Sequence, residues 1–305
     1  MPMKHIYYAF FFLIFFFVML FFPLETLEGT SNGLLLWFQI VLPSLLPFFI
    51  LTSLLIQTNS IYLIVKLFGP LLTRIFSVSL EGSFAIISGF LCGYPIGAKV
   101  TSDLVKQKRI SVNEGNYLLS FCNNSSPAFV SNFVILQTLK DPSLLLPSLF
   151  ILFLSPFLCS FLFRLYYGKH STNTQKHLSS NICFHFQMFD DSIMNAFESI
   201  TKIGGYIILF SVLFALGRKT RFHILLPLLE ITNGITYLNA SHYRFTWVYT
   251  SIMALGAFGG LCSIAQTNSV IQGSGLSILA YTIEKLITAL VTSLLAFTYV
   301  KIILR

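Results

Sequence analysis

The chain has 305 residues and is 55% apolar and 16% aromatic, with only 10% charged residues, whereas a soluble domain has roughly 25%. Several apolar runs exceed the ~17 residues that a spanning helix needs, and they are continuous rather than alternating. The composition therefore excludes a soluble protein, disfavours a β-barrel and predicts an all-α polytopic membrane protein whose partner is the lipid bilayer. The net charge of +8 does not indicate a nucleic-acid partner, because lysine and arginine in membrane proteins mark cytoplasmic loops.

The residue types that carry enzyme or metal chemistry form no recognisable arrangement. The five cysteines are odd in number and lack paired ligand spacing, so neither a disulfide framework nor a zinc site is indicated. The six histidines form no HExxH motif, and no Walker A motif is present. With no nucleophile–base pair in view either, we expect no cofactor, no metal and no enzyme activity.

The chain begins with three apolar runs. Ile6–Phe22 is expected to be an uncleaved first transmembrane helix with its N-terminus inside. Leu34–Ile56 is expected to span the membrane and contains two prolines, which remove backbone hydrogen bonds and kink a helix. Ile61–Val78 is interrupted by a lysine, a proline and an arginine, which predicts an interfacial or re-entrant piece.

The stretch Gly89–Lys99 carries three glycines, a proline and a lysine within a very apolar region, roughly Gly82–Leu104. A break at membrane depth is costly unless it lines a cavity, because the freed backbone groups find no water. We therefore predict the tip of a re-entrant helical hairpin that forms one wall of a solute pathway. The alternative is a small-residue face for helix packing, since the glycines recur at every fourth position.

A second interruption lies inside the predicted span Tyr117–Leu139. Its middle, Cys122–Pro127, holds two asparagines, two serines and a proline. The residue before a proline disfavours helix, so we predict an unwound segment that exposes polar groups to a cavity, with polar contacts between helices as the alternative. Leu144–Leu165 follows as an ordinary span.

The most polar part of the chain, Gly168–Asp191, is predicted to be a cytoplasmic linker between two halves. A span, a short apolar piece, a glycine-broken segment and a last span then follow, at Ile193–Leu216, Ile224–Leu238, Thr246–Ile271 and Leu276–Leu304.

The two halves share an order of elements: a span, a short proline-bearing piece, a glycine-rich hairpin and a span. With one gap, Gly89–Ser102 aligns with Gly256–Ser269 at two glycines, an alanine and a serine. When the spans are followed from an inner N-terminus, the repeats are inverted, which is the usual plan of secondary transporters with discontinuous helices. The basic loop Arg218–Arg221 then lies outside, against the positive-inside rule, so its sidedness stays open.

Polar residues inside these segments are the candidate solute ligands. Lys99 either neutralises a substrate carboxylate or reaches for the interface, and Glu230 either binds a proton or a substrate donor or pairs with Arg218. Glu198 and Lys202 are spaced for a local ion pair. Free N–H groups at half-helix N-termini suit an anion. The predicted substrate-binding residues are Gly93, Tyr94, Pro95, Gly97, Lys99, Asn123, Asn124, Ser125, Ser126, Glu230, Asn233, Gly260 and Gln266.

Several of these motifs resemble one family. Ser88–Lys99 (SGFLCGYPIGAK), Glu114–Gly115 and Phe121–Pro127 (FCNNSSP) resemble the YlbJ (SpoVV) family of sporulation integral membrane proteins, as do Leu229–Gly234 and Phe258–Leu261 with the glutamine that follows. The resemblance implies nucleoside-recognition Gate domains related to concentrative nucleoside transporters. It also implies a role in endospore formation, in moving dipicolinic acid across the mother-cell-derived outer forespore membrane.

The predicted elements divide the chain into four parts. The domains are a first transmembrane helix (1–28), a first Gate-like repeat with one extra span (29–167), the linker (168–192) and a second Gate-like repeat (193–305). The expected function is a transporter of a small anionic solute, with nucleoside transport or a non-transporting scaffold for spore-envelope assembly as alternatives. A coupling ion (proton or sodium) and a homo-oligomer are left open.

Overall fold

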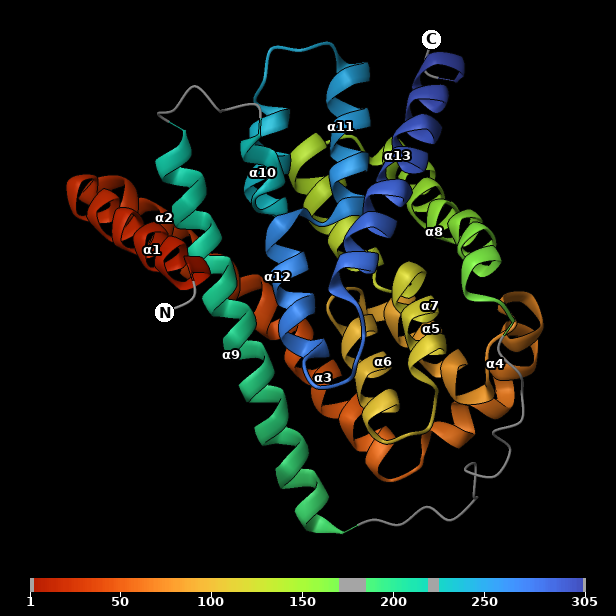
Figure 1. The fold of residues 1–305 in the computed structure, drawn as a ribbon. Helices are drawn as coiled ribbons and strands as arrows, with labels where there is room; N and C mark the ends of the chain where they lie inside the picture. The colour runs from red at the N-terminus through yellow and green to blue at the C-terminus, as the bar shows by residue number, and fades with distance from the viewer. Residues whose placement is uncertain (1–2, 170–184, 219–224, 304–305) are drawn as a thin grey trace.

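The computed structural model describes residues 3–169, 185–218 and 225–303, and every regular element in these ranges is helical (Figure 1). Four helical stretches there are long and apolar enough to cross a membrane, and two bent helix pairs raise the number to six if each pair is one span. The four are Pro142–Tyr167, Phe186–Gly217, Phe245–Ile271 and Ile278–Ile302. The expected all-α polytopic membrane protein is confirmed, whereas most of the predicted linker lies outside the described residues.

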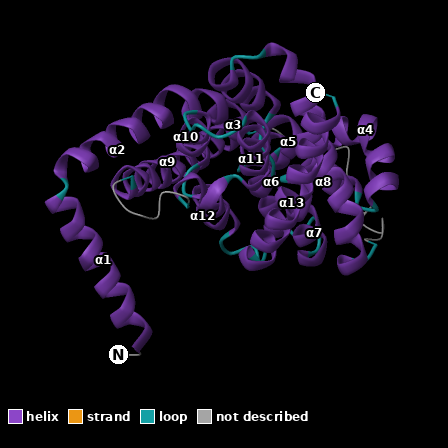
Figure 2. Ribbon diagram, turned by 90° about the horizontal axis from the view of Figure 1, so that it is seen from above, coloured by secondary structure: helices purple, strands orange, loops and turns teal. Residues whose placement is uncertain are grey.

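The N-terminal helices bend twice. Helix α1 (Met3–Phe21) meets α2 (Pro23–Leu36) at a break of 103°, and Figure 2 shows α1 pointing away from the other helices. Helix α2 continues through a π-helical turn, η1 (Trp37–Val41), into α3 (Leu42–Gln57). Helix α4 (Ile61–Phe76) then leaves α3 at 91°, as expected for an interfacial or re-entrant piece.

Helix α2 packs closely along α9 (Phe186–Gly217) through two glycines one turn apart. A Cβ atom on Gly29 would lie 2.6 Å from the Val212 Cα, and one on Gly33 would lie 2.7 Å from the Ile208 Cα. Small residues on one helix let the backbone of a neighbouring helix approach this closely in a bilayer. Because glycine has no Cβ atom at these two positions, α2 can pack directly on the backbone of α9, and this contact holds the N-terminal helices against the second half of the chain.

The predicted hairpin and the unwound segment are both present. Helix α5 (Leu80–Cys92) turns at Gly93–Pro95 into the antiparallel α6 (Ile96–Lys106). Helix α7 (Val112–Cys122) ends in a non-helical stretch, after which the π-helix η2 (Phe129–Leu139) continues. Helices α5 and α7 both begin after a serine whose hydroxyl accepts a hydrogen bond from a backbone N–H of the first turn, so each helix has an N-cap.

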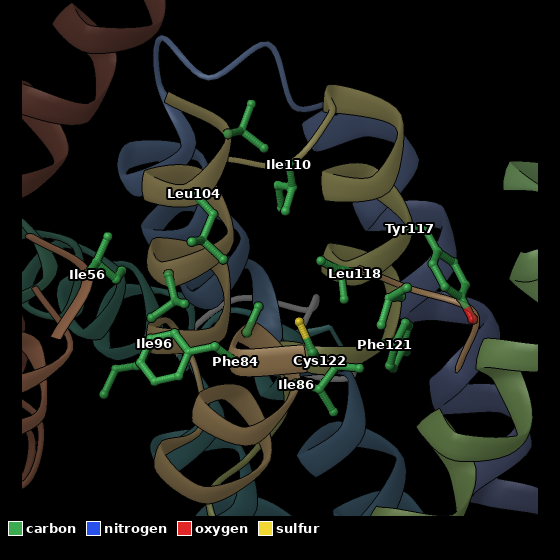
Figure 3. Packing of buried hydrophobic residues seen from close by; sticks show 14 of the residues in the cluster. Ile56, Phe84, Ile86, Ile96, Leu104, Ile110, Tyr117, Leu118, Phe121 and Cys122 are labelled. Carbon is green, nitrogen blue, oxygen red and sulfur yellow. The ribbon is translucent and has the colours of Figure 1, made fainter. Parts of the chain in front are cut away.

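A large apolar cluster holds α5, α6 and α7 together (Figure 3). Phe84, Leu104 and Leu118 are at most 2% exposed, and the Phe121 ring stacks on Phe76 with ring centroids 5.0 Å apart. Lipid tails are as apolar as these side chains, so close van der Waals packing rather than water exclusion is what favours their contact. The cluster makes the hairpin a rigid support for the residues at its tip.

The second half differs from the prediction at Gly256–Gln266. Helices α11 (Phe245–Phe258) and α12 (Gly260–Ile271) run on as one 27-residue stretch, so the expected hairpin there is wrong. Gly259, at φ +86°, interrupts the helix without reversing the chain. The alignment with Gly89–Ser102 therefore pairs a hairpin with a broken through-going helix, and the inverted repeat stays a prediction.

The second half also contains two short helical elements in succession, η4 (Leu226–Leu228) and α10 (Ile231–Asn239). In Figure 1, α10 and α11 lie in the upper part of the view and α5 and α6 in the lower part. The last helix, α13 (Ile278–Ile302), lies beside α11 and also contacts α7 and α8 (Leu145–Tyr167). The short helix α10 and the hairpin helices α5 and α6 therefore lie toward opposite ends of the molecule in this view (Figure 1).

Candidate solute site

The helix interruptions of both halves meet at one place. The Tyr94 N–H donates to the Asn124 carbonyl at 2.7 Å, which joins the hairpin tip to the unwound segment. The Ser125 hydroxyl contacts the Tyr94 hydroxyl at 3.0 Å and donates to the Gly256 carbonyl at 2.6 Å, which joins both to the broken helix α11–α12. The Cys262 N–H donates to the Leu229 carbonyl at 2.9 Å, which adds the start of α10.

Glycines in the hairpin serve close backbone packing. A Cβ atom on Gly89 would lie 1.8 Å from the Cys122 carbonyl oxygen, and one on Gly97 would lie 2.4 Å from the same atom. Gly93 has φ +81°, and a Cβ there would lie 2.6 Å from the Ser126 N. The last carbonyl of α7 is therefore enclosed by α5 and α6, as the small-residue interpretation expects, and the tip lies directly against the unwound segment.

Asn123 ties four helices together and is fully buried. Its side-chain oxygen accepts from the Ala98 N–H at 3.3 Å, and its amide nitrogen donates to the Thr267 and Tyr281 hydroxyls at 3.1 and 2.8 Å. All of its side-chain hydrogen bonds thus go to the protein. Asn123 shapes the site and does not line the cavity described below.

Glu230 begins α10. Its carboxylate accepts from the backbone N–H groups of Thr232 and Asn233 at 3.1 and 2.8 Å, and from the Asn233 side chain at 3.0 Å. A helix N-terminus favours a negative charge, which explains how an acid that is only 2% exposed is held here. The alternative pairing with Arg218 is wrong, because Arg218 contacts Glu28 at 2.7 Å.

A cavity of about 460 Å³ opens at the meeting point, within the ~300–1,000 Å³ typical of small-molecule sites. Five predicted residues line it: Tyr94, Ser125, Ser126, Glu230 and Gln266. Four further polar residues line the cavity that were not among the predicted ligands, namely Gln39, Asn132, Gln137 and Thr232. The signal that was available for three of these is an isolated amide inside an apolar run.

The rest of the cavity wall is apolar and partly aromatic. Phe129 and Phe133 both line it, and their rings stack with centroids 5.3 Å apart. Glu230 is the one charged side chain among the lining residues, and no lysine, arginine or histidine of the described chain lines the cavity. The site thus combines neutral hydrogen-bonding groups, a ring-stacking wall and one carboxylate.

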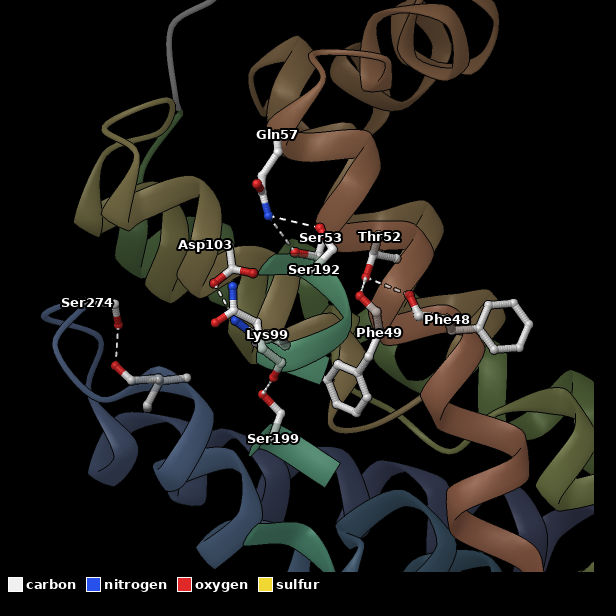
Figure 4. Close-up of polar contacts among 12 residues, drawn as sticks. Phe48, Phe49, Thr52, Ser53, Gln57, Lys99, Asp103, Ser192, Ser199 and Ser274 are labelled. Atoms are coloured by element: carbon white, nitrogen blue, oxygen red, sulfur yellow. Dashed lines mark hydrogen bonds and ion pairs between the residues drawn. The ribbon is translucent and has the colours of Figure 1, made fainter. Parts of the chain in front are cut away.

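Lys99 lies elsewhere. Its ammonium pairs with Asp103 at 2.7 Å, one turn along α6 (Figure 4). Both line a separate polar cavity of about 550 Å³ between α3, α6 and α9, beside Gln57, which donates to Ser192 at 3.0 Å. The structure therefore does not bring Lys99 together with Asn123–Ser126 as one anion site.

The other predicted ligands form the frame of the site. Pro95 precedes α6, the Asn233 amide also donates to Ser211 at 3.1 Å, and a Cβ on Gly260 would lie 3.2 Å from the Leu228 carbonyl oxygen. Their substrate contacts stay predictions. The local ion pair between Glu198 and Lys202 is confirmed at 2.6 Å.

Lys285, which was not among the predicted ligands, lies on α13 and is 1% exposed. Its ammonium donates to the Asn123 carbonyl at 3.0 Å and to the Asn124 side-chain oxygen at 3.2 Å. Lysine inside a spanning helix is rare, and that rarity was the available signal.

Comparisons with known proteins found two similarities to this chain. A family model described as Gate, nucleoside recognition, matches residues 38–160, which include the hairpin and the unwound segment. The chain is 28% identical over 250 residues to "Sporulation integral membrane protein YlbJ" of Bacillus subtilis (strain 168), which covers 75% of this chain and 58% of the relative. No solved structure matches the chain. The resemblance found in the motifs is therefore confirmed: the chain is similar to this sporulation membrane protein, and its residues 38–160 match the Gate nucleoside-recognition model.

Proposed function

We propose that the chain is a transporter that binds a small polar solute in the cavity where its helix interruptions meet. The observation that carries the proposal is the position of Ser125, which joins the hairpin tip, the unwound segment and the broken helix α11–α12. Secondary transporters bind solutes between discontinuous helices, because free backbone groups and polar side chains are available only there. Movement of the hairpin against α11 would change all three walls of the cavity together.

A neutral, ring-bearing solute such as a nucleoside fits the lining best. The stacked Phe129 and Phe133 rings offer a surface for a planar base, and the amides of Asn132 and Gln137 offer donors and acceptors. The Glu230 carboxylate suits the hydroxyl donors of a sugar and repels a dianion. The nucleoside-recognition description of the matching family supports the same class.

Dipicolinic acid, a small planar dianion, is the second candidate. The Lys285 ammonium on Asn124 places a positive charge one residue from the cavity-lining Ser125, which favours an anion. Dipicolinic acid and the outer forespore membrane come from the resemblance of the sequence motifs, and the similar protein of Bacillus subtilis is described only as a sporulation integral membrane protein. The repulsion from Glu230 weighs against it, because no lining side chain of the described residues offsets that charge.

Replacement of Glu230 by glutamine separates the two candidates by the direction of its effect. We expect uridine to bind the purified protein about tenfold more weakly after Glu230→Gln, because a hydrogen bond to a charged group is lost, at about 1.5 kcal/mol. Dipicolinate should bind more tightly, because a like charge is removed. The measurement is equilibrium binding of each compound in lipid nanodiscs.

The matched control is Glu198→Gln, since that carboxylate lies on the exposed side of α9 and pairs only locally with Lys202. It should leave both affinities unchanged. If neither compound binds the wild-type protein, these two substrates are excluded, and a scaffold role in spore-envelope assembly becomes the better hypothesis.

A further inference from the structure

Lys285 is a buried ionisable residue whose side chain does not line the solute cavity. It lies in the first half of the spanning helix α13 and is absent from the cavity lining. An ionisable residue at membrane depth is costly to keep and usually marks a functional contact. No salt bridge joins Lys285 to a carboxylate in the described part of the chain, so its charge is held by neutral oxygens.

The sequence of the unwound segment explains why the Asn123 carbonyl accepts a hydrogen bond from Lys285. In a continuous helix the Asn123 carbonyl would accept from the N–H four residues later, but that residue is Pro127, which has none. The next carbonyl, of Asn124, is satisfied by the Tyr94 N–H at the hairpin tip. The Asn123 carbonyl is satisfied by the Lys285 ammonium instead.

An unwound backbone carbonyl beside an amide oxygen is the kind of site that binds a sodium ion in discontinuous transport helices. Here an ammonium contacts both oxygens, at 3.0 and 3.2 Å. We propose that Lys285 is a tethered cation that occupies the position of a coupling ion on the unwound segment, so that solute binding needs no sodium. This inference deepens the proposed function and rests on it for the statement about solute.

The test compares thermal unfolding of the purified protein in sodium chloride and in choline chloride at equal ionic strength. For the wild type we expect the two midpoints to agree within about 1 °C, because no vacant cation position remains. Lys285→Ala should lower the midpoint in choline by about 5 °C or more. Sodium or methylammonium chloride should restore at least half of that loss, because either cation can occupy the vacated position.

Lys301→Ala is the matched control, since this lysine lies in the exposed last turn of the same helix; it should change neither midpoint. Lys285→Ser, whose side chain is also too short to reach the two oxygens, replaces the alanine variant if that variant does not fold, and should show the same cation rescue.

Two results would overturn the inference: a wild-type midpoint that rises specifically with sodium, or a Lys285 variant whose loss no cation restores. The unfolding measurement uses no solute, so the failure of uridine and dipicolinate to bind would refute the proposed function without deciding the role of Lys285. Uridine binding to the wild type, measured in both salts, then tests the statement about solute. Affinity that increases about tenfold with sodium would contradict it.

Discussion

Gly89→Ala is expected to destabilise the protein more than the replacement of any other glycine by alanine. The new Cβ atom would lie 1.8 Å from the Cys122 carbonyl oxygen and 3.2 Å from the Gly97 Cα, and neither backbone atom can rotate away. The hairpin would have to separate from α7, at a cost of about 3 kcal/mol or more. The measurement is the thermal unfolding midpoint of purified protein in detergent, together with its yield from membranes.

Gly205→Ala is the control for this substitution. Gly205 also lies inside a helix, α9, but nothing lies within 4 Å of a Cβ atom built there. Alanine should stabilise α9 by up to about 1 kcal/mol, because glycine is the poorer helix former. Equal stability of the Gly89 and Gly205 variants would show that the hairpin does not pack against α7 as described.

Arg109→Met is also expected to destabilise the protein strongly. The Arg109 guanidinium follows α6 and contacts the Glu81 carboxylate at 3.1 Å, the Ile56 carbonyl at 3.0 Å and the side chain of Asn59. Glu81 is 1% exposed, so the variant leaves a buried carboxylate without its guanidinium partner. Breaking a buried ion pair on one side typically costs about 3–5 kcal/mol. Thermal unfolding again measures the loss.

Lys202→Met is the comparison for Arg109→Met, because the Lys202–Glu198 pair is exposed, at 54% and 65% for the two side chains. Exposed pairs contribute about 0–1 kcal/mol, so this variant should unfold close to the wild-type temperature. A similar loss in both variants would mean that the pair at Arg109 is accessible to water and does not brace the hairpin.

The interruptions of the first half were predictable because each rests on local chemistry. Glycine and proline at Gly93–Pro95 and the residues before Pro127 disfavour helix whatever surrounds them, and the structure breaks at both places. The pair Gly259–Gly260 was ambiguous for the same reason. Glycine permits a reversal but does not require one, and packing of α11 against α13 keeps the helix direction there.

Side-chain partners were harder to predict, and the two lysines show why. The pairing of Lys99 with Asp103 is local, at a spacing of four residues, so the sequence contained the signal that this lysine was not free to bind an anion. Lys285 contacts residues more than 160 positions away, and no local pattern encodes such a contact. Proline removes a donor and so predicts that a carbonyl needs a partner, but only the fold shows which one.

Glu230 shows a different limit. An acid in an apolar segment predicts a functional site, yet the same residue at the start of a helix predicts a cap. The structure places the carboxylate in both positions, since it accepts from Thr232 and Asn233 and also lines the cavity. These N–H donors stabilise the ionised form of the carboxylate, so a negative charge stays at the cavity wall and disfavours an anionic solute.

Occupancy of the cavity by solute, at the meeting of the helix interruptions, is tested most directly by the modification rate of Ser126→Cys with a small methanethiosulfonate reagent. The protein used has its Cys92 and Cys183 replaced. Uridine at about ten times its Kd should slow the reaction about tenfold, because only the free site reacts. Ser53→Cys, in the separate polar cavity, should react at the same rate with and without uridine. Bound uridine that leaves Ser126→Cys unprotected, or that protects Ser53→Cys instead, would contradict the account.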